Sequence, residues 1–187
     1  MSTKTAATIA QLTQCETKAE VVNGELVRLS PTGFVPGRAS GEIYASLRAY
    51  ERHHGTGYAI PDNVGFLVDL PHRQSCSPDA AWYVGPVTGM QFLDGAPAFA
   101  VEVRSEHDYG PAAERELAAK RRDYFAAGTL VVWDVDLLHA DVVQVYRADR
   151  PDQPTIYRRG DLADAEPAVP GWTMPVDDLV PPEHDPT

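Results

Sequence analysis

The stretch FAVEVRSE, from Phe99 to Glu106, decides how the fold can be read from the sequence. Alternate residues of a β-strand face opposite sides of a sheet, so the larger apolar residues of this strand would share one face. The other face would carry two alanines and two charged residues, namely Ala98, Ala100, Glu102 and Arg104. The alanines indicate that another element packs closely over this face. A carboxylate beneath a packed element costs free energy unless it pairs with a cation or binds a metal, so Glu102 should have such a partner.

The clearest helix of the sequence follows this strand, in GPAAERELAAKRRDYFAAG, residues 110–128. A proline suits its first turn, and a glycine suits its C-terminal end. Lys120 belongs to the apolar stripe of this helix, because Leu117 lies three residues before it and Tyr124 four residues after it. A lysine on a stripe that faces a sheet needs a partner for its ammonium group. Glu102, on the alanine-lined face of the strand, is the obvious candidate.

The rest of the chain reads as short strands and one more long helix. EVVNGELVRLS predicts a hairpin around Asn23-Gly24, and a helix is expected over 38–54, before Gly55. A short helix is expected near 5–18, and a loop over 87–97. Further strands are expected at 57–60, 64–70, 78–84, 129–136, 141–148 and, at a sheet edge, 154–159. These elements predict one α+β domain over 20–180, with a helical segment over 1–19 and a flexible tail over 181–187.

Composition excludes several classes of protein. Of the 187 residues, 43% are hydrophobic and 23% are charged, which is ordinary for a globular domain, and no apolar run is long enough to cross a membrane. The first residues lack the features of a secretory signal. Cys15 and Cys76 have no metal-ligand spacing, so a reduced cytoplasmic protein is expected. The net charge of −11 counts against tight, non-specific binding of DNA by a monomer.

Three residues suggest chemistry when they are taken together: Asp79, Glu102 and Lys120. Asp79 follows Pro78 at the start of a predicted strand. Two carboxylates and a lysine in one pocket suit metal-assisted hydrolysis of a phosphodiester, because carboxylate oxygens hold Mg²⁺ and an ammonium group can position water or stabilise the transition state. Each residue also has a structural interpretation. Asp79 could shape a turn, Glu102 could form a structural ion pair with Arg104 or another basic residue, and Lys120 could extend its charge into water.

Other motifs are weaker. SEHD, residues 105–108, contains the residue types of a hydrolase triad, but neighbours in sequence point apart and a triad must converge in space. The sequence has no HExxH motif, no paired Cys/His pattern, no Walker loop and no GxGxxG motif. The three tryptophans are expected in the core rather than stacked on bases.

Six segments carry a family resemblance, in the order GELVRLSP, SPDAAWYV, GAPAFAVEVRS, KRRDYFAAGTLVVWDVD, VQVYR and PGWTMPVDDL. Over about residues 20–179 they resemble the Uma-type family of restriction endonucleases, a bacterial branch of the PD-(D/E)XK nuclease superfamily. The resemblance implies a restriction-endonuclease-like core, with a central mixed β-sheet flanked by helices and an N-terminal β-hairpin. It also implies DNA as substrate, and Mg²⁺, or Mn²⁺ in its place, held by Asp79 and Glu102.

The sequence departs from the family pattern in two places. The superfamily lysine usually lies two positions after the glutamate, where this chain has Arg104, which cannot accept a proton but could hold a phosphate. Lys120 takes the place of that lysine on the helix. A histidine often found before the first long helix is replaced by Pro36-Gly37. Many superfamily nucleases use a further acid from an N-terminal element, and both Glu42 and Glu25 are candidates.

These observations predict a Mg²⁺-dependent endonuclease that acts on DNA. Two alternatives stay open. One is a catalytically degenerate protein that keeps the fold for binding or assembly, which the acidity and Arg104 favour. The other is a hydrolase of small phosphate esters. A homodimer is expected, because duplex cleavage pairs two active sites and an edge strand can be covered by a partner.

Overall fold

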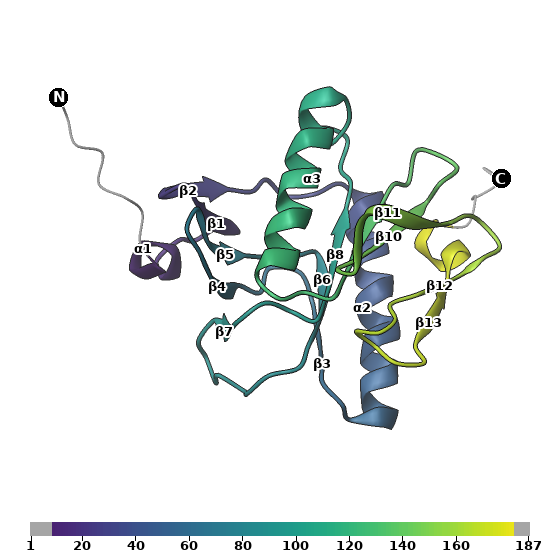
Figure 1. Ribbon diagram of the computed structural model, residues 1–187, viewed down its shortest axis with the longest axis horizontal. Helices are drawn as coiled ribbons and strands as arrows, with labels where there is room; N and C mark the ends of the chain where they lie inside the picture. Colours follow the sequence, from purple (N-terminus) through teal and green to yellow (C-terminus); the bar gives the residue numbers. More distant parts are fainter. Residues whose placement is uncertain (1–8, 182–187) are drawn as a thin grey trace.

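A six-stranded mixed sheet forms the centre of the computed structural model, which describes residues 9–181 (Figure 1). Its strand order is β11-β10-β9-β8-β6-β3. The central strands β8 (Phe99–Val103) and β9 (Val131–Val135) are parallel, and every other neighbouring pair in this sheet is antiparallel. The other four strands are β3 (Tyr58–Ile60), β6 (Ala80–Tyr83), β10 (Val143–Arg147) and β11 (Arg150–Tyr157).

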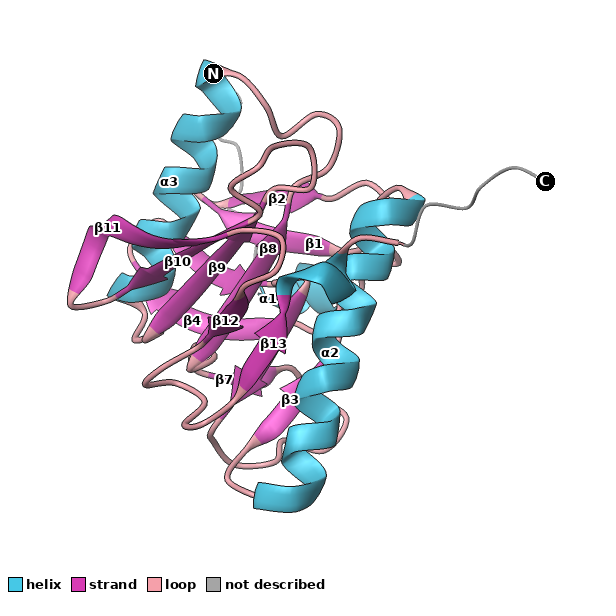
Figure 2. Cartoon of the chain, turned by 90° about the vertical axis from the view of Figure 1, so that its right-hand side faces the viewer, coloured by secondary structure: helices cyan, strands magenta, loops and turns pink. Residues whose placement is uncertain are grey.

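Two long helices cover opposite faces of this sheet (Figure 2). Helix α2 (Phe34–His54) packs on the face that carries Phe99, and helix α3 (Pro111–Ala126) packs on the face that carries Ala100. The small side chain of Ala100 leaves room for buried Tyr124 of α3. The two alternating faces of β8 therefore lie under different helices, as the opening stretch of sequence predicts.

Helix α2 begins four residues before the predicted start at residue 38. Pro36 lies in the first turn, where a helix has no intrahelical partner for the backbone N–H and therefore tolerates proline. The C-terminal end is as expected, because Gly55 adopts the left-handed conformation with φ 62°. The Pro36-Gly37 pair that replaces the family histidine is therefore part of the helix.

A second sheet packs beside α3 on the same face of the central sheet, in the order β2-β1-β5-β4-β7 (Figure 1). It contains the predicted hairpin, whose turn residues Asn23 and Gly24 have φ values of 51° and 69°, as a tight two-residue hairpin requires. Strands β5 and β7 were not predicted, because RQSC lacks apolar alternation and β7 has two residues within an expected loop. The strands of this sheet are β1 (Ala19–Val22), β2 (Glu25–Arg28), β4 (Phe66–Leu70), β5 (Arg73–Cys76) and β7 (Leu93–Asp94).

The C-terminal part of the described chain completes the core on the α2 side. It contains β12 (Leu162–Asp164), β13 (Thr173–Pro175) and the 3₁₀ helix η1 (Val176–Leu179), none of which the sequence predicted. Trp82, Trp133 and Trp172 are all at most 3% exposed, which confirms them as core residues.

At the N-terminal side, the described part of the expected helix near 5–18 is α1 (Ile9–Thr13), so the helix ends earlier than expected. Residues 1–8 and all but the first residue of the expected tail 181–187 lie outside the described part of the chain. Within that part, no helix is both long enough and apolar enough to span a membrane.

Candidate active site

Glu102 lies on the face of β8 that α3 covers, and both of its carboxylate oxygens accept hydrogen bonds from that helix. The Nζ atom of Lys120 donates to Oε2 at 2.8 Å, and the hydroxyl group of Tyr124 donates to Oε1 at 2.6 Å. The two donors lie one helical turn apart and so share one face of α3. The predicted contact between Lys120 and Glu102 is therefore confirmed. Glu102 forms its ion pair with this lysine, whereas Arg104 pairs with Asp134, and the side chain of Lys120 is only 18% exposed.

Asp79 lies immediately before β6 and next to Glu102 on the sheet. Ala80 pairs with Val101, so one more step of the antiparallel register places Asp79 across from Glu102, at a position where side chains on one face are neighbours. One carboxylate oxygen, Oδ2, accepts a hydrogen bond from the backbone N–H of Val103 at 2.8 Å. Asp79 is therefore bonded directly to the strand that carries Glu102.

A lysine and a serine from other elements hold Asp79 in this place. The Nζ atom of Lys18, just before β1, lies 2.9 Å from Oδ1 of Asp79 and 2.6 Å from Oδ1 of Asp62. The hydroxyl group of Ser40, on α2, donates to the backbone carbonyl of Asp79 at 2.9 Å. Both sheets and α2 therefore contribute to the position of one carboxylate.

A third carboxylate, Glu20 on β1, lies on the other side of Lys120. Its Oε1 atom is 3.3 Å from Nζ of Lys120 and accepts the backbone N–H of Ser77 at 2.9 Å. Its Oε2 atom pairs with Arg73 of β5, whose Nε donates to Asp123 of α3 at 2.7 Å. Glu20 is thus fixed by donors from β5 and from the residue that follows it, and its charge faces the same ammonium group as Glu102.

The pKa values of these groups depend on one another. Burial raises the pKa of Glu102 to about 7, against the effect of Lys120 and with the help of the charges on Asp79 and Glu20. Burial also opposes ionisation of Glu20, but the charges of Lys120 and Arg73 hold the pKa of Glu20 below its usual value. Although burial lowers it, the two glutamates raise the pKa of Lys120 overall. Lys120 is therefore a permanent positive charge at neutral pH.

The residues present suit a hard divalent cation. Within residues 9–181, no three side chains of His, Cys, Asp or Glu form a preassembled metal cluster. Mg²⁺, however, is usually held by one or two carboxylates, with water and substrate phosphate in the other positions. Asp79, immediately before β6, and Glu102, on the adjacent strand β8, are close enough for the charge of Asp79 to raise the pKa of Glu102, and they match that pattern.

Arg104 does not join this cluster. Its guanidinium group makes two hydrogen bonds to Asp134 of β9, at 2.7 and 2.8 Å, and pairs with Glu114 in the first turn of α3. With its side chain 4% exposed, it ties α3 to the sheet. All three nitrogens of its guanidinium group already contact protein carboxylates, so this arrangement lends no support to the expectation that Arg104 holds a phosphate.

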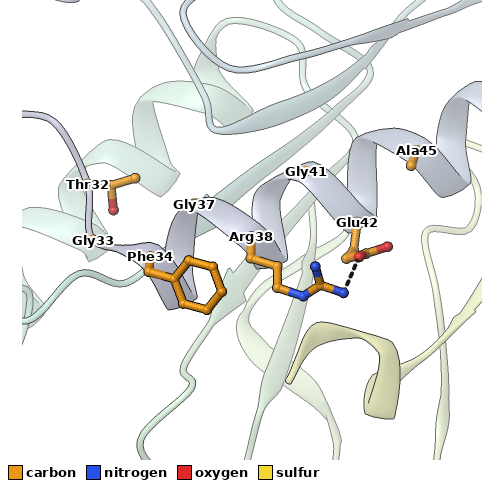
Figure 3. A pocket seen from close by; sticks show the side chains of 8 residues that line it. All are labelled: Thr32, Gly33, Phe34, Gly37, Arg38, Gly41, Glu42 and Ala45. Carbon is orange, nitrogen blue, oxygen red and sulfur yellow. Dashed lines mark ion pairs between the residues drawn. The ribbon is translucent and has the colours of Figure 1, made fainter. Parts of the chain in front are cut away.

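The two candidates for an additional acid lie elsewhere. Glu42 pairs with Arg38 at 2.8 Å and lines a hollow of about 570 Å³ along α2, together with Phe34 and Gly41 (Figure 3). Glu25 is exposed at the first position of β2. The acid that the structure places beside Lys120 is Glu20. A single glutamate in a four-residue strand gives no sequence signal for this, and neither does Lys18, because both depend on pairing with segments more than 50 residues away.

Comparison with known proteins agrees with this fold. A family model described as "Putative restriction endonuclease" matches residues 7–177. A crystal structure of a putative nuclease belonging to DUF820, from Anabaena variabilis, superposes with a TM-score of 0.71 over 92% of this chain and 96% of that chain, at 15% identity. This likeness shows a shared fold. A search of curated proteins gives no match. Because the family model spans nearly the whole chain, the protein belongs to the Uma2 family of putative restriction endonucleases.

Proposed function

We propose that this protein is a Mg²⁺-dependent nuclease that hydrolyses phosphodiester bonds of DNA. The observation that carries the proposal is the convergence of Asp79, Glu102 and Lys120, from the start of β6, the middle of β8 and the inner face of α3. Two adjacent carboxylates and a fixed ammonium group are the parts that metal-assisted hydrolysis of a phosphodiester requires.

Asp79 and Glu102 would hold the ion. A bound Mg²⁺ would supply stabilisation of the charge on the phosphate and a lower pKa for the attacking water. Lys120 would add a second positive charge, because its raised pKa keeps it protonated and excludes it as a general base at neutral pH. Glu20 acts as a positioning residue, since its contact holds the Lys120 ammonium group beside Glu102.

Membership of this family supports DNA as the substrate. The charge distribution of the protein limits how tightly it can bind DNA. A net charge of −11 opposes a broad electrostatic footprint on DNA. The exposed Arg115 and Arg122 lie on the outer side of α3, away from the side chain of Lys120, so they offer phosphate contacts on the helix surface rather than in the site. With so few basic contacts, the affinity for DNA should fall only gradually as salt is raised.

A cleavage assay on supercoiled plasmid and linear duplexes, with Mg²⁺ or Mn²⁺, tests this function. Glu102→Gln should lower the rate by about 100-fold or more, because it removes a charge that the ion and Lys120 both need. Glu116→Gln, the same chemical change at an exposed position of α3, is the matched control and should cleave at the wild-type rate. Equal rates for Glu102→Gln and the wild-type protein would remove Glu102 from the mechanism.

A second candidate function is binding or assembly without catalysis. It is favoured by one observation, that all four carboxylate oxygens of Asp79 and Glu102 already have protein donors. Titration calorimetry with Mn²⁺ separates the two functions. A nuclease should show one stoichiometric site that Asp79→Asn abolishes, whereas a scaffold should show none.

We also propose that two copies of the chain associate. Strand β11 is the outermost strand of the central sheet and is largely exposed, so its free edge can pair with a second copy. Duplex cleavage needs two cuts, which a symmetric dimer supplies. Light scattering after size exclusion should give twice the mass of the chain, and a single-chain mass would contradict the dimer.

A further inference from the structure

A second lysine, Lys18, contacts an acid of the candidate active site. The sequence contains three lysines, Lys4, Lys18 and Lys120, and two of them contact the acids of this cluster. The side chain of Lys18 is 16% exposed, and its Nζ atom lies between Asp79 and Asp62. The proposed mechanism assigns this residue no role.

The contact of Lys18 with Asp79 competes with an ion for the same carboxylate. Oδ2 of Asp79 already accepts the backbone N–H of Val103, so apart from Lys18 Oδ1 is the less occupied oxygen for an external ligand. Oδ1 is the atom that Lys18 contacts at 2.9 Å. With the carboxylates of Asp62 and Asp79 at 2.6 and 2.9 Å from its Nζ atom, Lys18 is present as an ammonium ion. A protein cation therefore already lies where a divalent ion would bind.

Asp62 provides a place to which this ammonium can move. Its carboxylate lies 2.6 Å from Nζ of Lys18, and its side chain is 43% exposed, against 24% for Asp79. Lys18 thus bridges an inner and an outer carboxylate. A small movement of its flexible stem would break the contact with Asp79 and keep the contact with Asp62.

We propose that Lys18 is an internal counter-ion of the metal site, and that a divalent ion binds by displacing its ammonium group from Asp79 toward Asp62. This inference rests on the proposed function, because it concerns the same metal site. Two cations on one carboxylate oxygen repel each other, so Lys18 lowers the affinity for the ion and Asp62 raises it by accepting the displaced group. Without an ion, Lys18 neutralises the inner carboxylate and keeps the site assembled.

Titration calorimetry of the full chain with Mn²⁺ tests the exchange without measuring cleavage. Lys18→Met should bind Mn²⁺ about tenfold more tightly, because no ammonium has to be displaced. Asp62→Asn should bind it several-fold more weakly, because the displaced ammonium loses its outer partner. The second variant changes a partly exposed side chain, so it tests the proposal even where Lys18→Met folds poorly.

The double variant Lys18→Met/Asp62→Asn separates displacement from long-range charge. Its net charge equals that of the wild-type protein, so a purely long-range effect would return the affinity to the wild-type value. Displacement predicts that the double variant still binds Mn²⁺ more tightly than the wild-type protein, since the competing ammonium group is absent.

The outcomes distinguish this inference from the function on which it rests. A Mn²⁺ site with the same affinity in the wild-type protein and Lys18→Met would overturn the role of Lys18 and leave the metal-dependent function standing. A site that appears only in Lys18→Met would support the role of Lys18 in its strongest form. No site in any variant would overturn both.

Discussion

At the scale of single residues, the charge of Lys120 is the feature on which the acidic cluster depends. Its ammonium group contacts both Glu102 and Glu20, at 2.8 and 3.3 Å. All three side chains are at most 18% exposed. A buried carboxylate that loses its counter-ion lowers the free energy of unfolding. Removal of one of several neighbouring carboxylates has a smaller effect, because it also relieves the repulsion between their charges.

Loss of Lys120 should therefore destabilise the protein more than neutralisation of its partner does. Lys120→Met should lower the free energy of unfolding by about 3 kcal/mol, because two acids lose their shared cation. Glu102→Gln should change it by no more than about 1 kcal/mol, since the pKa of Glu102, raised to about 7, shows that its charge is poorly accommodated. Urea unfolding with Mg²⁺ absent measures both values, and equal losses would contradict this account.

Asp136 gives a pH-dependent prediction away from the site. It follows β9, and its carboxylate accepts hydrogen bonds from His139, the backbone N–H of Leu138 and Tyr109. Burial opposes its ionisation, but these hydrogen bonds hold the pKa of Asp136 below its ordinary value of 3.8. A depressed pKa gives stability that is present above the unfolded value and is lost as pH falls through the folded value.

The variant Asp136→Asn should therefore be less stable than the wild-type protein by about 1 to 2 kcal/mol at about pH 7. The difference should be smaller at about pH 3 than at about pH 7, because below 3.8 the unfolded chain binds a proton that the folded chain takes up only at a lower pH. Denaturant unfolding at the two pH values measures the effect. A constant difference across this range would show that the charge of Asp136 contributes nothing.

At the scale of elements, the position of α3 determines whether the site forms, because α3 carries Lys120 and Tyr124. The sequence locates this helix well, but it does not show what fixes the helix against the sheet. Arg104 does so near the N-terminal end, through Asp134 and Glu114. Arg73 does so further along, through Asp123.

Removal of the guanidinium group of Arg104 should loosen α3 from the sheet. Arg104→Met leaves Asp134 buried and without this partner, so we expect a loss of about 3 kcal/mol in the free energy of unfolding. Arg104→Lys should have a free energy of unfolding between those of the wild-type protein and Arg104→Met, because an ammonium group keeps the charge but cannot reproduce the paired hydrogen bonds. Arg38→Met removes an exposed ion pair with Glu42 and should cost less than about 1 kcal/mol. Similar losses at both arginines, in urea unfolding, would refute the anchoring role.

At the scale of the whole molecule, the C-terminal segment closes the hydrophobic core. Trp172 lies 5.2 Å from Trp133 and 5.8 Å from Phe99, measured between ring centroids. Its indole N–H donates to the hydroxyl group of Ser46 on α2 at 3.1 Å. The last described elements therefore join α2 to the central sheet.

Truncation of this side chain should affect the whole fold. Trp172→Ala should lower the free energy of unfolding by about 4 kcal/mol, because it leaves a large cavity among aromatic rings. Trp172→Phe should cost less, since most of the volume is kept. Urea unfolding gives the two values. Losses below about 1 kcal/mol for the alanine variant would mean that the C-terminal segment is peripheral to the core.

The sequence by itself determined the elements on either side of the site and the contact between them. Alternation in β8 placed Glu102 under a packed element, and the helical stripe placed Lys120 toward it. Both patterns are local, since they depend on residues a few positions apart. The hairpin around Asn23-Gly24 is equally local, because its turn geometry is a property of those two residues.

Only the tertiary structure decided which other residues complete the site. Glu20 and Lys18 reach it because β1 pairs with β5, and the contacts that result span 57 and 61 residues of sequence. The polar strand β5 has no hydrophobic periodicity that would predict it. The role of Arg104 as an anchor of α3 likewise depends on Asp134, which lies beside it only in the folded sheet. Periodicity tells which face a side chain occupies, whereas the partner on that face depends on how distant strands pair.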